Sequence, residues 1–508
     1  MVPAVGTRIP LVQGSGMGLV AELGSLKKTQ VHAIWASYLG WTLDAFDFFL
    51  LVFMIKAIGA EFHAETETVL ELTFLTLAAR PFGAFFFGWL ADRYGRRPIM
   101  MAVILLFSFF SFASAFATTL PMLFVIRGLF GFAMGGEWGI GASLVMESIP
   151  AKLRGPVSGL LQSGYPSGYF LASLVYFLFF DQIGWRGMFM VGIVPAILVF
   201  LIRMHVDESP AFEKRRAQAK PNPFVELAKN WKIALYLVVL MTAFNFLSHG
   251  TQDTYPLFLQ KQHGFDTHTT GMLAIVMNIG AIVGGLSFGV WSEYVGRKRA
   301  IIIASLLVLP FIPLWAFAST PLMLGLGAFF VQVAVQGAWG IVPVHLNELS
   351  PALVRGMFPG FAYQLGNLIA SRNGPLQGWI AKTHDGNYGL ALALIAGVTV
   401  VVLVCWTAIG PERRDGDLAE IDQNHLNQHI PYLGIATSMI GILITGFLFI
   451  FISHIQIVGI DCYYLGQISE GSCVSQISYR SALAVGMILI ATGLGIVWSD
   501  RSNIVENK

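Results

Sequence analysis

The chain has 508 residues, of which 55% are hydrophobic and 12% are charged, and its mean hydropathy is +0.68. A soluble protein of this size could not bury so much apolar surface, which excludes most soluble enzymes. The net charge is only +2, and the basic residues are spread over many short segments, which excludes a nucleic-acid-binding protein. The sequence therefore predicts a protein that crosses the lipid bilayer several times.

Long apolar segments follow one another along the chain, each near the roughly 20 residues that a helix needs to cross a bilayer. They are rich in Leu, Ile, Phe and Gly and lack the period-2 alternation of barrel strands, so we expect an all-α membrane protein. The predicted spans lie near residues 31–55, 69–91, 98–117, 121–148, 155–180, 187–204, 233–259, 270–292, 299–318, 321–348, 356–380 and 387–409, with two more near 432–458 and 480–498.

The positions of the basic residues predict the orientation of these spans. Most of the 31 lysines and arginines fall in segments that lie on the same side of the membrane as the N-terminus. Loops that carry an excess of Lys and Arg remain in the cytoplasm. Both termini are therefore predicted to be cytoplasmic, in a plasma (inner) membrane.

A repeat divides the chain. The segment from Gly88 to Arg97, Gly-Trp-Leu-Ala-Asp-Arg-Tyr-Gly-Arg-Arg, recurs 201 positions later from Gly289 to Lys298 as Gly-Val-Trp-Ser-Glu-Tyr-Val-Gly-Arg-Lys. Transporters are often built from such repeats, so we expect two parallel six-helix bundles. The predicted organisation is a cytoplasmic segment 1–30, a bundle 31–204, a linker loop 205–232, a second bundle 233–410, a cytoplasmic connector 411–431, an accessory helix pair 432–498 and a cytoplasmic tail 499–508.

Charged residues repeat at the span ends on the side of the two loops. Asp92 can pair with arginines or cap a helix, and the loop glycines permit a tight turn. Ion pairs that form in one conformation and break in another would act as a gate, although these residues could instead only anchor the topology. The predicted gate residues are Asp92, Arg96, Arg97, Glu147, Arg154, Glu293, Arg297, Glu348 and Arg355.

The doubled loop motif and the two six-helix halves resemble the major facilitator superfamily over roughly residues 30–410. The resemblance implies a 6+6 helix bundle, here with two additional C-terminal transmembrane helices, that transports by rocking its halves around a central site. The sequence has no nucleophile motif, phosphate-binding loop or metal-ligand spacing, so we expect no enzyme activity, metal or cofactor.

Ionisable residues inside the spans are few, and each costs roughly 2.5–3.5 kcal/mol, which makes it a functional candidate. In the seventh span Asn245, His249 and Asp253 are four residues apart and share one helix face. An amide, an imidazole and a carboxylate in this order predict a proton relay. Alternative proton carriers are Asp44 and Asp47 in the first span and Glu137 in the fourth, and Arg80 is expected to pair with one of the two aspartates.

The seventh span carries a second resemblance. Asn-x-x-Ser-His-x-Thr-Gln-Asp, from Asn245 to Asp253, is similar to the motif of the lactate/pyruvate:proton symporters in the sialate:proton symporter branch, although Leu257 stands where that motif has threonine. An arginine suits a carboxylate substrate because its planar fork donates two hydrogen bonds. The substrate-binding residues implied by the resemblance are Arg127, Asn245, His249, Gln364 and Asn367, with Arg372 as a second-choice carboxylate ligand.

These observations favour proton-coupled symport of a small monocarboxylate such as lactate or pyruvate. The alternatives are a transporter of sialic acid or another organic acid, and a non-transporting sensor on a transporter fold. The expected partners are a small organic anion, protons and the bilayer, with the protein as a monomer. Cys462 and Cys473 lie in the loop predicted to be outside, between the two accessory helices, and are expected to form a disulfide.

Overall fold

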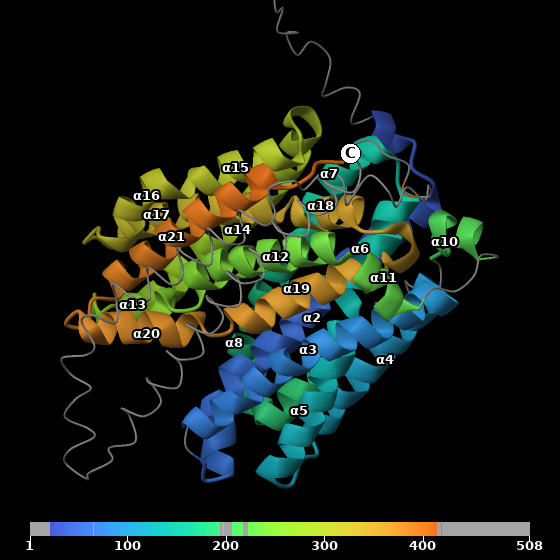
Figure 1. Ribbon diagram of the computed structural model, residues 1–508. Helices are drawn as coiled ribbons and strands as arrows, with labels where there is room; N and C mark the ends of the chain where they lie inside the picture. Colours follow the sequence, from blue (N-terminus) through green and yellow to red (C-terminus); the bar gives the residue numbers. More distant parts are fainter. Residues whose placement is uncertain are drawn as a thin grey trace, which may run out of the picture.

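The computed structural model describes residues 21–413, except for residue 65 and segments 194–196, 198–205 and 217–221, together with Leu418. All regular structure in this part of the chain is helical (Figure 1), which confirms the prediction of an all-α fold. The two predicted C-terminal spans, with Cys462 and Cys473, lie outside the described residues.

The first half of the described chain forms one bundle. Within it the first helix packs along the last, and the second packs along the fourth. Gly184 has a φ of 61° and interrupts the last helix between the predicted spans near 155–180 and 187–204. The helices are α2 (Lys28–Glu61), α3 (Thr66–Tyr94), α4 (Arg96–Ser114), α5 (Leu120–Gly135), α6 (Glu137–Ser148), α7 (Arg154–Gln162) and α8 (Gly164–Val191).

The second half repeats this plan with more interruptions. Two short helices, α10 (Pro210–Arg215) and α11 (Pro223–Lys229), precede it. Several predicted spans consist of two consecutive helices, such as the eleventh, which breaks at Arg372. The helices are α12 (Trp231–Gln252), α13 (Tyr255–Lys261), α14 (Thr267–Val295), α15 (Arg297–Leu306), α16 (Val308–Ala316), α17 (Pro321–Trp339), α18 (Val342–Leu349), α19 (Phe358–Ala370), α20 (Asn373–Thr383) and α21 (Tyr388–Ile409).

Eight stretches of the described helices are long and apolar enough to cross a membrane. They are Glu71–Tyr94, Arg96–Ser114, Leu120–Ser148, Trp231–Lys261, His268–Val295, Arg297–Ala316, Pro321–Leu349 and Tyr388–Ile409. The spans predicted near 31–55, 155–180, 187–204 and 356–380 are not among them. The first and last of these four contain buried polar residues, including Asp44, Asp47, Gln364 and Asn367, which lower their hydropathy.

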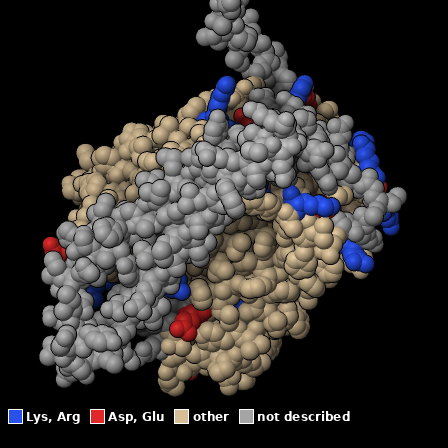
Figure 2. All heavy atoms as spheres, in the orientation of Figure 1, with Lys and Arg blue, Asp and Glu red and all other residues tan. Residues whose placement is uncertain are grey.

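The two loop motifs lie at the same end of the bundle, which we call the motif end. There α3 leads into α4 through Gly95, and α14 leads into α15 through Gly296. Figure 2 shows basic side chains along the edge of the molecule near α7 and α10, and a largely uncharged surface over the neighbouring helices. The two halves meet through α3 with α19 and through α7 with α14.

Candidate functional site

The loop glycines are required by the backbone. Gly95 and Gly296 have φ values of 116° and 96°, a region that L side chains rarely adopt. In each loop a carboxylate lies over the glycine and accepts hydrogen bonds from the next helix. Glu208 accepts from the backbone N–H groups of Arg96 at 3.0 Å and Arg97 at 3.1 Å, and Glu412 accepts from that of Arg297 at 2.5 Å.

Sequence analysis missed these two carboxylates. Both follow a bundle's final helix, and both cap the helix that begins after a loop motif. They are separated by 204 positions and so fall outside the ungapped repeat of 201. A search that allowed short gaps would have paired Asp-Glu208-Ser-Pro with Pro-Glu412-Arg.

Asp92 joins the two halves. Its carboxylate accepts hydrogen bonds from the backbone N–H groups of Gly356 at 2.8 Å and Met357 at 3.0 Å, where η2 (Ala352–Val354) leads into α19. The same carboxylate pairs with Arg96 at 2.9 Å. An acidic group in one half therefore holds the first turn of a helix in the other half.

Glu293 makes the equivalent contact in the opposite direction. Its carboxylate accepts a hydrogen bond from the backbone N–H of Gly155 at 2.6 Å, near the start of α7, and pairs with Arg297 at 2.6 Å. We call these two interhalf contacts, of Asp92 and of Glu293, the latches. The repeat of 201 residues relates Asp92 to Glu293, so the two latches are equivalent contacts in the two halves.

The other predicted gate residues surround the latches. Arg96 pairs with Glu147 at 3.3 Å, and Arg297 pairs with Glu348 at 3.2 Å. Arg355 lies 3.7 Å from Glu147 and therefore adds an interhalf pair. Arg154 donates to the carbonyl oxygen of Met146 at 3.1 Å, Ser143 donates to that of Arg355 at 2.7 Å, and Ser209 donates to Glu147. The motif end is closed in this conformation.

Arg80 occupies the centre of the molecule. Its guanidinium lies 3.4 Å from Asp44, and both side chains are at most 3% exposed, so the predicted pairing with one of the two aspartates is confirmed for Asp44. The backbone of Arg80 is approached closely by α5, because a Cβ at Gly135 would lie 2.1 Å from its carbonyl oxygen. Arg80 lies on α3, the first-half helix that packs against α19 of the second half.

Gln364 is buried on α19, the second-half helix that packs against α3. Along this antiparallel contact, the ring of Phe85 is 5.6 Å from that of Phe361, and Arg372 is 5.7 Å from the ring of Phe74. Arg80 and Gln364 both lie on the segments between these two contacts. Both side-chain polar atoms of Gln364 and the Nε of Arg80 are buried and have no hydrogen-bond partner among the described residues.

A hydrogen-bonded relay runs through the second half. His249 Nδ1 lies 3.0 Å from Asp253 Oδ2, and His249 Nε2 lies 2.9 Å from Asn367 Oδ1. The side chain of Asp253 is 55% exposed, so one end of the relay reaches solvent. The ladder expected from the sequence is therefore corrected at one position, because Asn245 donates to the carbonyl oxygen of Met241 and the amide next to His249 comes from α19.

Arg127 lies elsewhere, inside the first bundle. Its guanidinium is 3.8 Å from the ring centre of Phe130 and 5.4 Å from that of Phe189, and it acts electrostatically on Asp47. Asp47 accepts from Ser111 of α4 at 3.2 Å. Arg127 and Asp47 thus form a second buried charged group among α2, α4, α5 and α8, and the three guanidinium nitrogens of Arg127 have no hydrogen-bond partner among the described residues.

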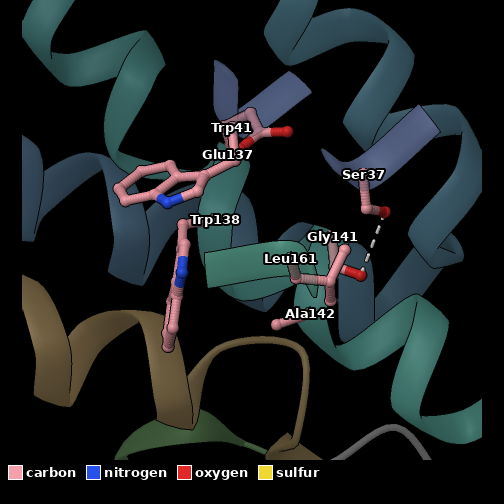
Figure 3. A pocket seen from close by; sticks show the side chains of 7 residues that line it. All are labelled: Ser37, Trp41, Glu137, Trp138, Gly141, Ala142 and Leu161. Carbon is pink, nitrogen blue, oxygen red and sulfur yellow. Dashed lines mark hydrogen bonds between the residues drawn. The ribbon is translucent and has the colours of Figure 1, made fainter. Parts of the chain in front are cut away.

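Aromatic rings close the centre toward the motif end. Tyr363 packs against Trp138 at 4.8 Å, Trp339 at 5.6 Å and Trp41 at 6.2 Å between ring centres. A small pocket next to these rings is lined by Trp41, Glu137 and Trp138, with Ser37 donating to the carbonyl oxygen of Gly141 on its other side (Figure 3). Glu137 therefore lies beside the central aromatic rings, close enough to Asp44 for the two carboxylates to interact electrostatically.

Comparisons with known proteins agree with this arrangement. The family model described as Major Facilitator Superfamily matches residues 38–266, and that described as Sugar (and other) transporter matches residues 228–412. The chain is 30% identical to a probable 4-methylmuconolactone transporter of Cupriavidus pinatubonensis, over 76% of this chain and 91% of the relative. It is 27% identical to the sialic acid transporter NanX of Escherichia coli, over 75% and 92% of the two chains.

A yeast relative and a solved structure are also similar. A carboxylic acid transporter protein homolog of Saccharomyces cerevisiae is 27% identical, over 80% of this chain and 73% of the relative. The structure of the proton:xylose symporter XylE has a TM-score of 0.64 at 17% identity, over 77% of this chain and 98% of that chain. This likeness concerns the fold alone.

Proposed function

This chain is a multi-pass membrane protein that belongs to the major facilitator superfamily, and from that membership we propose that it is a proton-coupled symporter of a small monocarboxylate such as lactate or pyruvate. The observation that carries the proposal is the pair of α3 and α19 across the two halves, where the Nε of Arg80 and both side-chain polar atoms of Gln364 are buried without a hydrogen-bond partner in the described part of the chain. A second support is the solvent-reaching relay of Asp253, His249 and Asn367 beside it. Relatives named for carboxylic acid, sialic acid and cis,cis-muconate transport agree with an organic anion as the substrate.

To the predicted carboxylate ligands Arg127 and Arg372 we add Arg80, and we propose it as the better-placed of the two buried arginines. It lies on α3, which packs against the second half, whereas Arg127 is enclosed within the first bundle by Phe130 and Phe189. A carboxylate at Arg80 would receive charged hydrogen bonds from the guanidinium and a further one from the Gln364 amide. Asp44 already pairs with Arg80, so anion binding is favoured when Asp44 is protonated.

That competition couples the anion to a proton. The relay offers the entry route, because Asp253 is exposed and His249 connects it to Asn367 near the centre. In this scheme Asp253 and His249 carry the proton toward Asp44, and Glu137 and Asp47 remain alternative carriers. Symport of one anion with one proton moves no net charge, so it avoids the roughly 2.3 kcal/mol per 100 mV that a charged step would involve.

The latches support alternating access. We propose that the motif end is cytoplasmic, that the membrane is the plasma (inner) membrane, and that residues 31–204 and 233–410 rock as two bundles joined by 205–232. The described conformation, with its latches formed, is then closed to the cytoplasm. We also propose that the protein acts as a monomer.

Uptake of radiolabelled lactate into proteoliposomes with an imposed inward proton gradient tests the proposal. Arg80→Gln should lower uptake by about 10- to 100-fold, because a charged hydrogen bond contributes about 1.5–3 kcal/mol. Asp253→Asn should abolish gradient-driven accumulation. The double variant Arg80→Gln with Asp44→Asn removes the unpaired carboxylate and shows whether lost uptake in the single variant reflects misfolding.

The results separate the alternatives. Loss of uptake in Arg127→Gln with retention in Arg80→Gln would move the anion site into the first bundle. Retained accumulation in Asp253→Asn would move the proton site to Asp44, Asp47 or Glu137. Absent lactate and pyruvate uptake by folded protein would overturn the monocarboxylate proposal, and labelled sialic acid would then be the next substrate tested.

A further inference from the structure

A continuous series of aromatic rings follows the groove between α2 and α8. Each ring contacts the next. The series begins at Trp41 of α2 and ends at Phe180 of α8. We call the series the aromatic column; its ring-centre distances are 5.5 Å for Trp41–Tyr165, 5.4 Å for Tyr165–Phe49, 4.5 Å for Phe49–Tyr169, 5.8 Å for Tyr169–Phe53, 5.3 Å for Phe53–Tyr176 and 4.5 Å for Tyr176–Phe180.

The inner end of the column reaches the second half. Trp41, the innermost ring, contacts Tyr363 of the second half at 6.2 Å between ring centres. The Arg80 guanidinium itself lies 5.6 Å from the ring of Phe48, which contacts Phe49 at 5.3 Å. The guanidinium proposed to bind the carboxylate is thus connected to the column through Phe48 and Phe49.

These rings differ from the lipid-facing aromatics of the same helix. Phe177 is 83% exposed and Phe170 is 53% exposed, and neither packs against another ring in the described part of the chain. In contrast, Tyr165 and Tyr169 are half-buried, and Trp41 is only 2% exposed. The indole N–H of Trp41 is buried without an acceptor among the described residues, so the innermost ring also presents an unused donor.

We propose that the transported acid has a planar, unsaturated body, which lies against Trp41 and Tyr165 while its carboxylate binds Arg80. This inference rests on the proposed function and narrows its substrate class. A planar π system can take the offset or edge-to-face arrangements that aromatic rings favour, whereas a saturated ring of the same size cannot. Lactate, which is small and tetrahedral, would use the carboxylate site but little of the column.

A matched pair of ligands tests this preference by binding rather than transport. Benzoate and cyclohexanecarboxylate have the same charge and ring size and differ in planarity. Their affinities for the purified protein in nanodiscs would be measured by isothermal titration calorimetry, with empty nanodiscs to subtract partitioning into lipid. We expect benzoate to bind about 2- to 12-fold more tightly, the ratio that corresponds to about 0.5–1.5 kcal/mol per aromatic contact.

Variants of one ring assign the preference to the column. Tyr165→Phe keeps the π face and should keep the preference, whereas Tyr165→Leu removes that face and should remove the preference. Phe177→Leu, on the exposed face of the same helix, is the control and should change neither affinity.

Three outcomes decide between the two proposals. Equal affinity for the two ligands in the unchanged protein, with measurable binding of both, overturns the planar-body inference and leaves the proposed function standing. A preference that persists in Tyr165→Leu also overturns it. Failure of benzoate, lactate and pyruvate alike to bind folded protein overturns the proposed function, and the inference with it.

Discussion

The latch at Glu293 allows the conformational equilibrium to be shifted by a single atom exchange, Glu293→Gln. The glutamine can still accept from the Gly155 N–H, but the bond loses its charge. A hydrogen bond to a charged group contributes about 1.5–3 kcal/mol and a neutral one about 0.5–1.5. The pair with Arg297 lies within one half and does not depend on closure, so only the Gly155 bond counts. The loss of about 0.5–2 kcal/mol should enrich the conformer open at the motif end by about 2- to 30-fold.

Distances between spin labels on the two halves measure this population. Cysteines at Lys152 and Arg299, both exposed, would carry the labels after the three native cysteines are replaced by serine. Glu61→Gln is the matched control, because the hydrogen bond from Arg186 holds the pKa of Glu61 below its ordinary value, and this pair lies within the first half at the other end. An unchanged distance distribution in folded Glu293→Gln, or an equal shift in both variants, would refute the latch.

Two stability predictions follow from local geometry. Gly95→Ala should lower the unfolding temperature, because it forces a side chain into a positive φ and places its Cβ against Glu208, whereas Gly397→Ala, at a helical site with open space around it, should leave the temperature unchanged or raise it. Gln332→Met should destabilise the protein by about 1–3 kcal/mol in chemical unfolding, because the amide of Gln252, which donates to Gln332 at 2.7 Å, is left without its acceptor. Unfolding at the unchanged denaturant concentration would contradict the second prediction.

Periodicity, charge and the repeat of 201 residues are sufficient to predict the bundle and the equivalence of Asp92 and Glu293, but not the backbone groups of the other half to which these carboxylates bind. Asp92 and Glu293 occupy the same position in the two copies of the loop motif, so the sequence alone shows that they are equivalent. Glu208 and Glu412 act at the same loops but come from the far end of each bundle. A fixed spacing between repeats does not predict contacts made by residues that are far away in the sequence and are brought together only by the fold.

The central site shows the same limit. Helical spacing predicted Asn245 below His249, but the i−4 position on a helix also lets an amide bond its own backbone, and Asn245 does so. The partner of His249 is Asn367, which a sequence can place only if the neighbouring helix and its rotation are known. The sequence predicts that Arg80 and Arg127 both lie at mid-membrane depth. It does not predict which neighbouring helices each side chain faces, and in this respect the two arginines differ.

The two latches together restrict how the halves can separate. Asp92 fastens α3 to α19 and Glu293 fastens α14 to α7, at two points related by the repeat. Two bodies held at two separate points can turn without strain only about the line that joins those points. Any other separation of the halves at the motif end strains both bonds, so the paired attachment makes opening cooperative.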